Sequence, residues 1–420
     1  MAERGRSVRE VVRRHRPDYQ IVVYVGILLL IGLVVLYAIS PASAELSGDG
    51  TSSSAGFIQR QLLYLLLGIV AFAIAAAAPL GWWQKHAGKI LLASLASCFL
   101  LVILGAAHVP LALCSGGACR WFNVGFITFQ PAELVKFGML LFCAGFLGRK
   151  VAAGKVNDWQ ETLLPLGLLV GVSSIFIIGF QRDMGTGLAL FGIIATMLFV
   201  AGIKAKLWMY LLGAAMALGL IFIIIAPYRL ARIATFLGSD SASDASGSSY
   251  HITQAKIALG TGGIFGLGLG QNVQAFGYLP EAPNDSIFAV MGESFGFLGL
   301  IGILIFLSAL LLRILNILDR TEDVTLRLVV AGVFGWLATH SILNIGAMVG
   351  IVPLTGITLP LLSFGGSSLL FIMLALGVVF SISRYSVHGK IRDDETDKPQ
   401  GAHGGRRLRR PRHASSGSYR

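Results

Sequence analysis

Long runs of apolar residues, separated by short polar connections, dominate this chain. A membrane-spanning helix needs about 20 consecutive, mostly apolar residues, and ten stretches approach that length. They cover residues 19–39, 62–80, 90–108, 132–148, 162–180, 187–202, 207–226, 286–312, 328–346 and 361–383. The pattern predicts an all-α, polytopic membrane protein with ten transmembrane helices and one large structured extracytoplasmic loop at residues 227–285.

The composition agrees with that prediction. Of the 420 residues, 55% are hydrophobic and only 13% are charged, and the mean hydropathy is +0.76. Soluble domains are usually about a quarter charged. The low charged fraction therefore excludes an ordinary soluble enzyme or binding module.

The basic residues indicate how the chain is oriented. The formal net charge is +12, and with a cytoplasmic N-terminus most Lys and Arg residues fall on the cytoplasmic side, as the positive-inside rule requires. Residues 1–18 are basic but lack the apolar core and cleavage site of a signal peptide. We expect a multi-pass protein of the cell inner (plasma) membrane with both termini in the cytoplasm. No folded basic module indicates nucleic-acid binding.

Three parts of the chain follow from this pattern. They are a basic cytoplasmic segment at residues 1–18, the ten-span membrane domain at residues 19–383, and a basic, disordered cytoplasmic tail at residues 384–420. Within the outer loop, residues 239–249 are of low complexity. Residues 251–278 are apolar and glycine-rich, which predicts packed or re-entrant backbone.

Two opposite charges lie inside the fourth apolar stretch. Glu133 and Lys136 are three residues apart, so they share one helix face and can pair. A charge within a span costs at least about 2.5 kcal/mol, and such residues usually face a polar interior. The pair is either a structural ion pair or part of a substrate site, and the residues alone leave both interpretations open.

A carboxylate precedes the eighth apolar stretch. Asp285 stands in the sequence LPEAPNDSIFAVMGE, directly before the run that begins at Ile287. Asp is frequent at helix N-caps, where it accepts hydrogen bonds from backbone N–H groups. Asp285 is equally placed to act as a general base at the membrane surface. A cap needs only the backbone, whereas a base must also face a cavity.

Three other segments carry weaker signals. Gln181–Gly187 indicates a tight outer turn with Asp183 as a helix cap. The glycines of residues 260–270 favour close backbone packing, since no strand-turn-helix context supports a nucleotide site. Residues 351–368 predict non-helical backbone at membrane depth, which is tolerated where it is buried or lines a cavity.

The four cysteines form two groups. Cys98 and Cys143 fall within apolar stretches, where we expect buried packing residues. Cys114 and Cys119 lie in an outer loop, on a face that is oxidising in most bacteria. A local disulfide and two free thiols are both compatible with the sequence. The His residues are scattered, and no His, Cys or carboxylate spacing predicts a metal site.

Five motifs, in this order, resemble the SEDS family of bacterial cell-wall proteins, whose members include FtsW, RodA and SpoVE. The motifs are RWFNVGFITFQPAELVKF, QRDMGTG, YHITQAKIALGTGGIFGLGLG, LPEAPNDSIFAVMGE and NIGAMVGIVPLTGITLPLLSFGGSS. The resemblance covers roughly residues 15–385. The stretch Phe276–Ala282 is more similar to FtsW than to RodA, which favours division over elongation.

The resemblance implies an activity and its residues. Family members are peptidoglycan glycosyltransferases that polymerise lipid II, an undecaprenyl-linked disaccharide-peptide, with a class B penicillin-binding protein and other division or elongation proteins. Asp285 matches the essential aspartate of the family and is the expected catalytic residue. Glu133 and Lys136 match the family's PSE-x-x-K pair, and Arg120 and Trp121 match its RW pair. These four are the expected substrate-binding residues.

Cations and a helix end would stabilise the departing diphosphate. The candidates are Arg120, Lys136, Arg229, Arg232, and the helix end with Ser363, Ser367 and Ser368. The family also suggests a divalent cation, Mg²⁺ or Mn²⁺, which the sequence does not show. The chain departs from the family pattern at Ala132, usually Ser, at Arg182, usually Pro, and at Ser294, usually Glu. Ser294 argues against a role that needs two adjacent carboxylates.

Two other functions fit part of the sequence. A lipid-linked precursor flippase or other transporter would also use intramembrane charges such as Glu133 and Lys136. It needs charges along a path, however, rather than one base at one rim. A non-enzymatic scaffold of the division machinery would recruit and activate a synthase partner and show no activity of its own.

The orientation is tested by labelling from outside the cell. A cysteine introduced at Ser243, in the predicted outer loop, should react with a membrane-impermeant thiol reagent on intact cells. A cysteine introduced at Ser415 should react only after the cells are opened. Labelling of position 415 from outside would contradict the ten-span topology.

Overall fold

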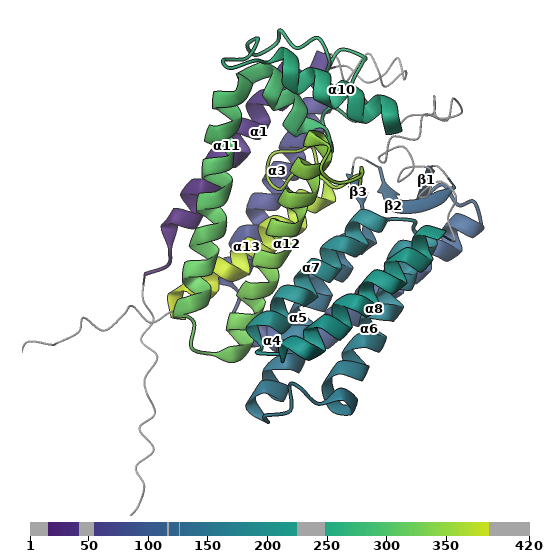
Figure 1. Cartoon of the computed structure of the whole chain (residues 1–420), viewed down its shortest axis with the longest axis vertical. Coiled ribbons are helices and arrows are strands. Elements are labelled where there is room, and N and C mark those ends of the chain that lie inside the picture. Colours follow the sequence, from purple (N-terminus) through teal and green to yellow (C-terminus); the bar gives the residue numbers. More distant parts are fainter. Residues whose placement is uncertain (1–15, 42–53, 116, 126, 225–247, 386–420) are drawn as a thin grey trace, which may run out of the picture. The chain divides into compact units, whose positions relative to one another are not determined.

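The computed structural model describes residues 16–41, 54–115, 117–125, 127–224 and 248–385 (Figure 1). The helices that overlap the ten apolar stretches are α1 (Tyr19–Ala38), α3 (Ser54–Ala77), α4 (Leu80–Ala106), α5 (Pro131–Ala152), α6 (Leu164–Ser174, between π-helical turns at Trp159–Leu163 and Ile175–Phe180), α7 (Met184–Val200), α8 (Ala205–Ile224), α11 (Ile287–Arg320), α12 (Val324–Val349) and α13 (Ser367–Ile382). Within the described residues, nine helical segments are long and apolar enough to span a membrane, and α7 is a shorter apolar helix. The chain is a polytopic, multi-pass membrane protein.

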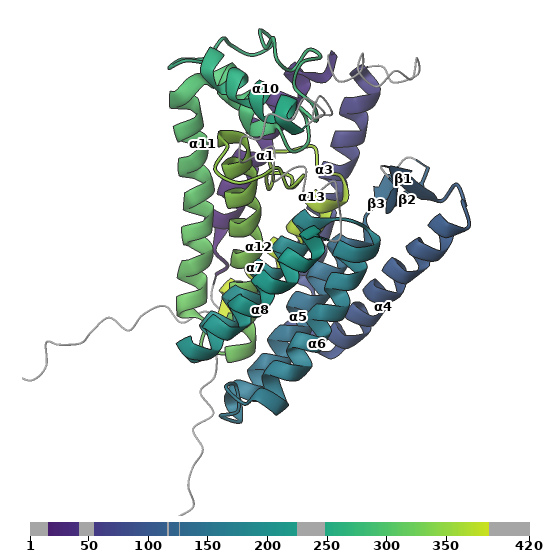
Figure 2. The same ribbon diagram turned by 45° about the vertical axis from the view of Figure 1, so that its right-hand side comes forward.

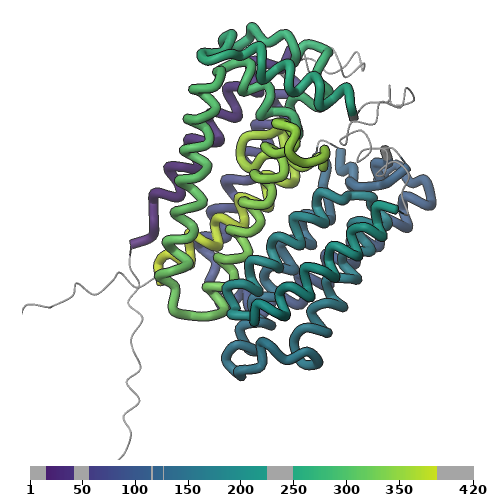
Figure 3. The backbone as a smooth tube through the Cα atoms, viewed as in Figure 1, coloured from purple at the N-terminus to yellow at the C-terminus, as the bar shows by residue number. Residues whose placement is uncertain are grey.

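Three helices, α5, α12 and α13, are the most enclosed, because neighbouring helices bury most of their residues. α3 packs along α13, α7 along α12, and α4 along α5. The early helix α3 and the late helix α13 therefore lie side by side, as Figures 1 and 2 and the tube of Figure 3 show. α8, by contrast, has no buried residue.

The predicted ends of several spans are wrong. The last span is predicted from residue 361, but α13 begins at Ser367. Leu361 and Leu362 are buried although their backbone is not helical, and hydropathy alone does not separate buried coil from buried helix. α3 and α4 begin more than two turns before residues 62 and 90, because polar residues continue both helices toward their N-termini.

A small antiparallel sheet joins α4 to α5, where the sequence predicted no strand. Its strands are β1 (Ala112–Ser115), β2 (Ala118–Val124) and β3 (Ile127–Phe129), in the order β1-β2-β3. Cys114 and Cys119 are cross-strand partners and form a disulfide, which settles the alternative that the sequence left open. The bridge packs on Gly105 near the end of α4. Cys98 and Cys143 are buried free thiols, as expected.

The helix that follows Asp285 is broken rather than continuous. α11 has 34 residues, about 51 Å at 1.5 Å per residue, which exceeds the roughly 30 Å of a bilayer core. Gly296 interrupts it with φ 67° and ψ −169°. Residues 287–294, before the break, are buried by protein. The long part after Gly296 is the one that has the length of a span.

The glycine-rich segment packs against this break through its backbone. Phe297 N donates to Gly263 O at 2.9 Å, and Leu298 N donates to Ile264 O at 3.1 Å. A Cβ atom on Gly296 would lie 2.3 Å from Gly266 N. The close backbone packing predicted for residues 260–270 is therefore present. α10 (Ser248–Thr261) precedes this segment and packs on α11.

Some predictions concern residues outside the described ranges. Residues 239–247 of the low-complexity stretch, together with the cations Arg229 and Arg232, lie outside them. So do the first fifteen residues and the tail from residue 386. The proposed part boundaries at residues 18 and 384 stay predictions.

Replacing Gly296 by Ala should destabilise the protein. The new Cβ atom would meet the Gly266 backbone and hold Ala in a backbone conformation that is essentially restricted to Gly, for a total of about 2–6 kcal/mol. Gly302→Ala is the matched control, because Gly302 lies in the same helix with open space around its Cβ position. Thermal unfolding in detergent should show a lower midpoint for Gly296→Ala only. Equal midpoints for the two variants would contradict the break.

Candidate functional site

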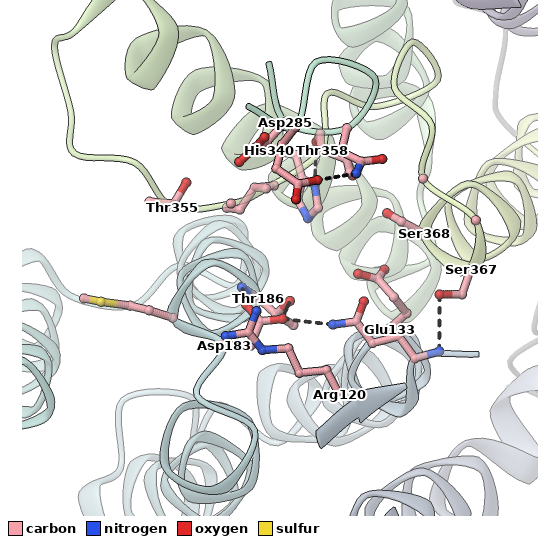
Figure 4. A pocket seen from close by; sticks show the side chains of 18 of the residues that line it. Arg120, Glu133, Asp183, Thr186, Asp285, His340, Thr355, Thr358, Ser367 and Ser368 are labelled. Atoms are coloured by element: carbon pink, nitrogen blue, oxygen red, sulfur yellow. Dashed lines mark hydrogen bonds between the residues drawn. The ribbon is translucent and has the colours of Figure 1, made fainter. Parts of the chain in front are cut away.

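A cavity of about 560 Å³ lies where the ends of α5, α7 and α13 meet the segment before α11 and the segment after α12 (Figure 4). Six residues predicted for the site are in its wall: Arg120, Trp121, Glu133, Asp285, Ser367 and Ser368. Residues of the turn Arg182–Thr186 and of the segment Pro353–Thr358 form further parts of the wall. Residues from distant parts of the sequence therefore meet at one place.

Two predicted residues of the described part of the chain are not in this wall. Lys136 and Ser363 are buried behind it. Ser363 Oγ accepts a hydrogen bond from Leu359 N at 2.8 Å, so it holds the turn before α13 rather than facing the cavity. Arg229 and Arg232 lie outside the described residues.

The start of α5 carries the buried ion pair. Pro131 occupies the first turn, where its missing N–H costs nothing. One turn further, Lys136 Nζ lies 2.7 Å from Glu133 Oε1, and both side chains are almost fully enclosed. The second carboxylate oxygen, Glu133 Oε2, has no partner within hydrogen-bond geometry among the described residues. It faces the cavity next to the Ser368 hydroxyl (Figure 4). The pair exists as predicted, and Glu133 alone presents it to the cavity.

The ion pair has a third member that the sequence analysis missed. His340 Nε2 lies 3.1 Å from Lys136 Nζ and 3.2 Å from Trp336 Nε1. Lys136 Nζ also lies 4.8 Å from the centre of the Trp336 ring, a cation–π arrangement. Trp336, His340 and Asn344 recur every four residues in one span, which was the available signal in the sequence.

Asp285 lies at the cavity, one residue before the helix cap. The N-cap position of α11 belongs to Ser286. Asp285 is 9% exposed, and its Oδ2 lies 3.9 Å from the position that a Cβ atom on Gly356 would occupy. Asn344 Nδ2 donates to the backbone oxygens of Asp285 and Ile357, each at 2.7 Å. Asn344 therefore fixes the backbone on both sides of this carboxylate.

The turn before α7 forms the opposite wall. Asp183 caps α7, because its carboxylate accepts from Thr186 N at 2.9 Å and from Thr186 Oγ1 at 2.7 Å. Gln130 Nε2 donates to the same carboxylate at 2.9 Å. Arg120 donates to the carbonyl oxygens of Gln181 and Arg182, both at 3.0 Å. The predicted cap is present, and Arg120 holds the turn while it lines the cavity.

The N-terminus of α13 also meets the cavity. Gly366 precedes it with φ 41°, and Ser367 and Ser368 form its first turn. Ser367 Oγ accepts from Gln130 N at 3.2 Å, which ties α13 to the start of α5. The first N–H groups of a helix attract anions. Together with Arg120, this helix end places positive potential on one part of a wall that also carries the carboxylates of Glu133, Asp183, Glu281 and Asp285.

Glu293, the carboxylate next to the departure Ser294, has a structural role. Its Oε1 accepts from Val273 N at 2.8 Å and from Gln274 N at 3.1 Å. Ser294 Oγ donates to Asn272 Oδ1 at 3.1 Å. Both side chains anchor the outer segment to α11 and neither lines the cavity. Glu281, which the sequence analysis did not single out, does line it.

The carboxylates of the cavity do not form a metal-binding cluster. Within the described residues, no group of three or more His, Cys, Asp or Glu side chains is placed to hold a metal ion. The Asp183 carboxylate is already engaged by Thr186 and Gln130. The described residues therefore form no protein-only cage for a divalent cation, and we assign no step to one.

The sequence matches the FtsW/RodA/SpoVE family of cell cycle proteins over residues 19–388. It is 36% identical over 378 residues to stage V sporulation protein E of Bacillus subtilis (strain 168), covering 89% of this chain and 99% of that protein. It is 35% identical over 362 residues to the probable peptidoglycan glycosyltransferase FtsW of Aliivibrio salmonicida (strain LFI1238), covering 84% of this chain and 86% of that protein.

Two solved structures are similar in fold. One is a chain of a peptidoglycan synthase complex that coordinates polymerization and crosslinking, with a TM-score of 0.66 and 26% identity over 88% of this chain and 98% of that chain. The other is the rod shape determining protein RodA of Thermus thermophilus, with a TM-score of 0.64 and 24% identity over 89% and 98%. At that identity the second likeness concerns the fold alone.

Breaking the buried ion pair from one side should destabilise the fold. Lys136→Ala leaves the Glu133 carboxylate buried without its cation, at a cost of about 3–5 kcal/mol. The double change Glu133→Gln with Lys136→Met leaves no buried charge and should recover most of the loss. Lys155→Ala is the control, because that lysine pairs with Glu161 at the exposed surface, where solvent screening leaves a pair with little effect on stability. Thermal unfolding in detergent measures all three. A Lys136→Ala midpoint equal to that of Lys155→Ala would contradict the prediction.

Proposed function

The chain belongs to the FtsW/RodA/SpoVE family of cell cycle proteins, and from this membership we propose that it is a peptidoglycan glycosyltransferase that polymerises lipid II. The observation that carries the proposal is the cavity. It brings together the Asp285 carboxylate, the Arg120 guanidinium and the N-terminus of α13, in a wall that also contains Glu133, Asp183, Glu281 and Arg182. A group transfer from a lipid diphosphate needs a proton acceptor and anion stabilisation at the same site.

Asp285 is the base in the proposed reaction. Its carboxylate takes the proton of the acceptor GlcNAc 4-hydroxyl as that oxygen attacks the anomeric carbon of the donor MurNAc. The new C–O bond forms on the face opposite the departing group, so the configuration inverts. The bond from the anomeric carbon to undecaprenyl diphosphate breaks, and the diphosphate leaves with the electron pair. Enclosure in the cavity keeps competing water away from the anomeric carbon.

Arg120 and the first turn of α13 stabilise the departing diphosphate. Two of the five Arg120 donors are engaged by backbone oxygens, which leaves further N–H groups for a ligand. The first turn of α13 adds a positive helix end, although Ser368 N already donates to Gly365 O at 2.7 Å. Lys136 acts through Glu133, since Glu133, His340 and Trp336 enclose its ammonium group. Arg229 and Arg232 remain candidates beyond the described residues.

The location of the cavity suits a substrate that is half in the membrane. Asp285 stands before the buried part of α11, while the long part of that helix spans the bilayer. The undecaprenyl chain would stay in lipid and the sugars would enter the cavity from outside. We place the protein in the inner membrane with both termini cytoplasmic. A class B penicillin-binding protein is the proposed partner, since a similar chain was solved in a peptidoglycan synthase complex.

The family relatives favour a role in division. Several are named FtsW, and one is a sporulation protein. A flippase has less support, because Lys136 is locked between three side chains and does not line an open path. A scaffold without activity would not need a carboxylate held at a cavity. The assay below separates both alternatives from a polymerase.

Asp285→Asn should abolish polymerisation while leaving the fold intact. Asn is nearly isosteric but is no base, and loss of a general base typically costs about 10²- to 10⁴-fold in rate. Asp323→Asn is the matched control, because Asp323 caps α12 by accepting from Leu326 N and lies far from the cavity. The measurement is glycan product per minute from lipid II, for equal amounts of folded protein, each with its partner.

Two results would overturn this assignment. If Asp285→Asn keeps more than about a tenth of the wild-type rate, the loss of rate is too small for removal of a general base. A wild-type chain that forms no glycan with or without its cognate partner would favour the scaffold or the transporter.

A further inference from the structure

One face of α12 stands between the buried ion pair and the segment beside Asp285. Trp336, His340 and Asn344 follow one another at successive turns of this helix and are only 1–2% exposed. Side chains four residues apart in a helix lie on the same face. α12 packs against α5, which carries the ion pair. Its His340 also lines the cavity.

The contacts of His340 settle which ring nitrogen carries the proton. An indole N–H and an ammonium group can only donate hydrogen bonds. Nε2, which lies 3.2 Å from Trp336 Nε1 and 3.1 Å from Lys136 Nζ, is therefore the unprotonated nitrogen, and its single lone pair is shared between these two donors. The ring is then neutral, with its proton on Nδ1. Nδ1 donates to the Thr358 carbonyl oxygen at 3.2 Å.

Asn344 extends the same connection by one turn. It holds the backbone oxygens of Ile357 and Asp285, while His340 holds that of Thr358. Two consecutive residues of the cavity segment are thus fixed from one helix face, and the first shares its anchor with Asp285. In Figure 4, Asp285, His340 and Thr358 lie together on one side of the cavity, across from Asp183.

We propose that His340 is a positioning residue for glycosyl transfer, which connects the Lys136–Glu133 pair to the backbone segment that lies beside the Asp285 carboxylate. The proposal rests on the proposed function, in which Asp285 is the base. His340 does not itself take or give the reacting proton, because both ring nitrogens are engaged within the protein. It acts by keeping Thr358 in place on one side and Lys136 directed at Glu133 on the other.

Loss of the His340 hydrogen bonds should lower kcat rather than weaken substrate binding. Without the imidazole, the Thr358 carbonyl loses its donor, and the segment from residue 353 to residue 358 loses an anchor next to the one that Asn344 provides at Ile357. Displacement of a reacting group by about 1 Å can lower a rate about 10²-fold. Most of that loss should appear in kcat, since the anion-binding groups, Arg120 and the α13 helix end, lie on other elements.

The test compares two replacements of His340 in the full chain with its partner. His340→Gln keeps an acceptor for Lys136 and Trp336 and a donor for Thr358, whereas His340→Leu keeps neither. We expect His340→Leu to lower kcat about ten- to hundredfold with little change in KM for lipid II, and His340→Gln to retain most of the activity. Ser341→Ala is the control, since that buried hydroxyl donates only within α12, to Leu337 O. It should match the wild type.

A second readout does not depend on activity. Thr355 belongs to the anchored segment and its hydroxyl oxygen is buried. The native cysteines in the described residues are either buried or disulfide-bonded. Thr355→Cys should therefore react slowly with N-ethylmaleimide in an otherwise wild-type chain and in His340→Gln. It should react severalfold faster in His340→Leu at a temperature where both variants remain folded.

Several results would overturn the inference. They are wild-type kcat in His340→Leu, a rise in KM without a fall in kcat, failure of His340→Gln to restore activity, or equal labelling of Thr355→Cys in all backgrounds. The Asp285→Asn variant is measured in parallel. If wild-type protein makes no glycan, the proposed function fails, and the labelling rates alone still decide whether His340 anchors the segment.

Discussion

An ammonium group buried among membrane helices is the constraint on which this structure depends. Lys136 has no exposed surface, and an isolated charge there would cost several kcal/mol. The protein surrounds it with a carboxylate from α5 and with His340 and Trp336 from α12. Because each partner must lie within hydrogen-bond or ring-contact distance of Nζ, the two helices are fixed relative to each other. The cavity lies directly over this junction.

Next to this junction, side chains of α12 also fix the non-helical backbone that follows the helix. The segment after α12 would leave unsatisfied carbonyl groups at membrane depth, which is tolerated only where protein or a cavity surrounds it. His340 and Asn344 donate to two of these oxygens, those of Thr358 and Ile357, and Asn344 also donates to the backbone oxygen of Asp285 before α11. The break at Gly296 separates the buried start of α11 from the long part that follows. A rigid scaffold of helices thus presents the reactive groups on irregular segments, as in many enzymes.

The sequence predicted the spans well, because long apolar runs report membrane burial directly. It failed where burial and helicity separate, as at Leu361 and Leu362, which are buried coil. The sheet was missed because its strands are only three to seven residues long. Asp285 and Glu133 were found through a local motif and a residue type that is rare in membranes. His340 was missed because its key partner, Lys136, lies 204 residues away, and no local pattern encodes such a contact.

The charged groups around the cavity are held before any ligand arrives, and this bears on how they could act. Arg120 is tied to two carbonyl oxygens of the turn before α7, and Asp183 in that turn is tied to Gln130. A side chain restrained in this way loses less conformational freedom on binding. Preorganised donors also need no rearrangement when charge develops in a transition state, and they act more strongly in a poorly solvated site than in water. The hydrogen bonds from Arg120 to the turn therefore also fix the direction of its remaining donors. The same guanidinium can hold the turn and be oriented toward a ligand in the cavity.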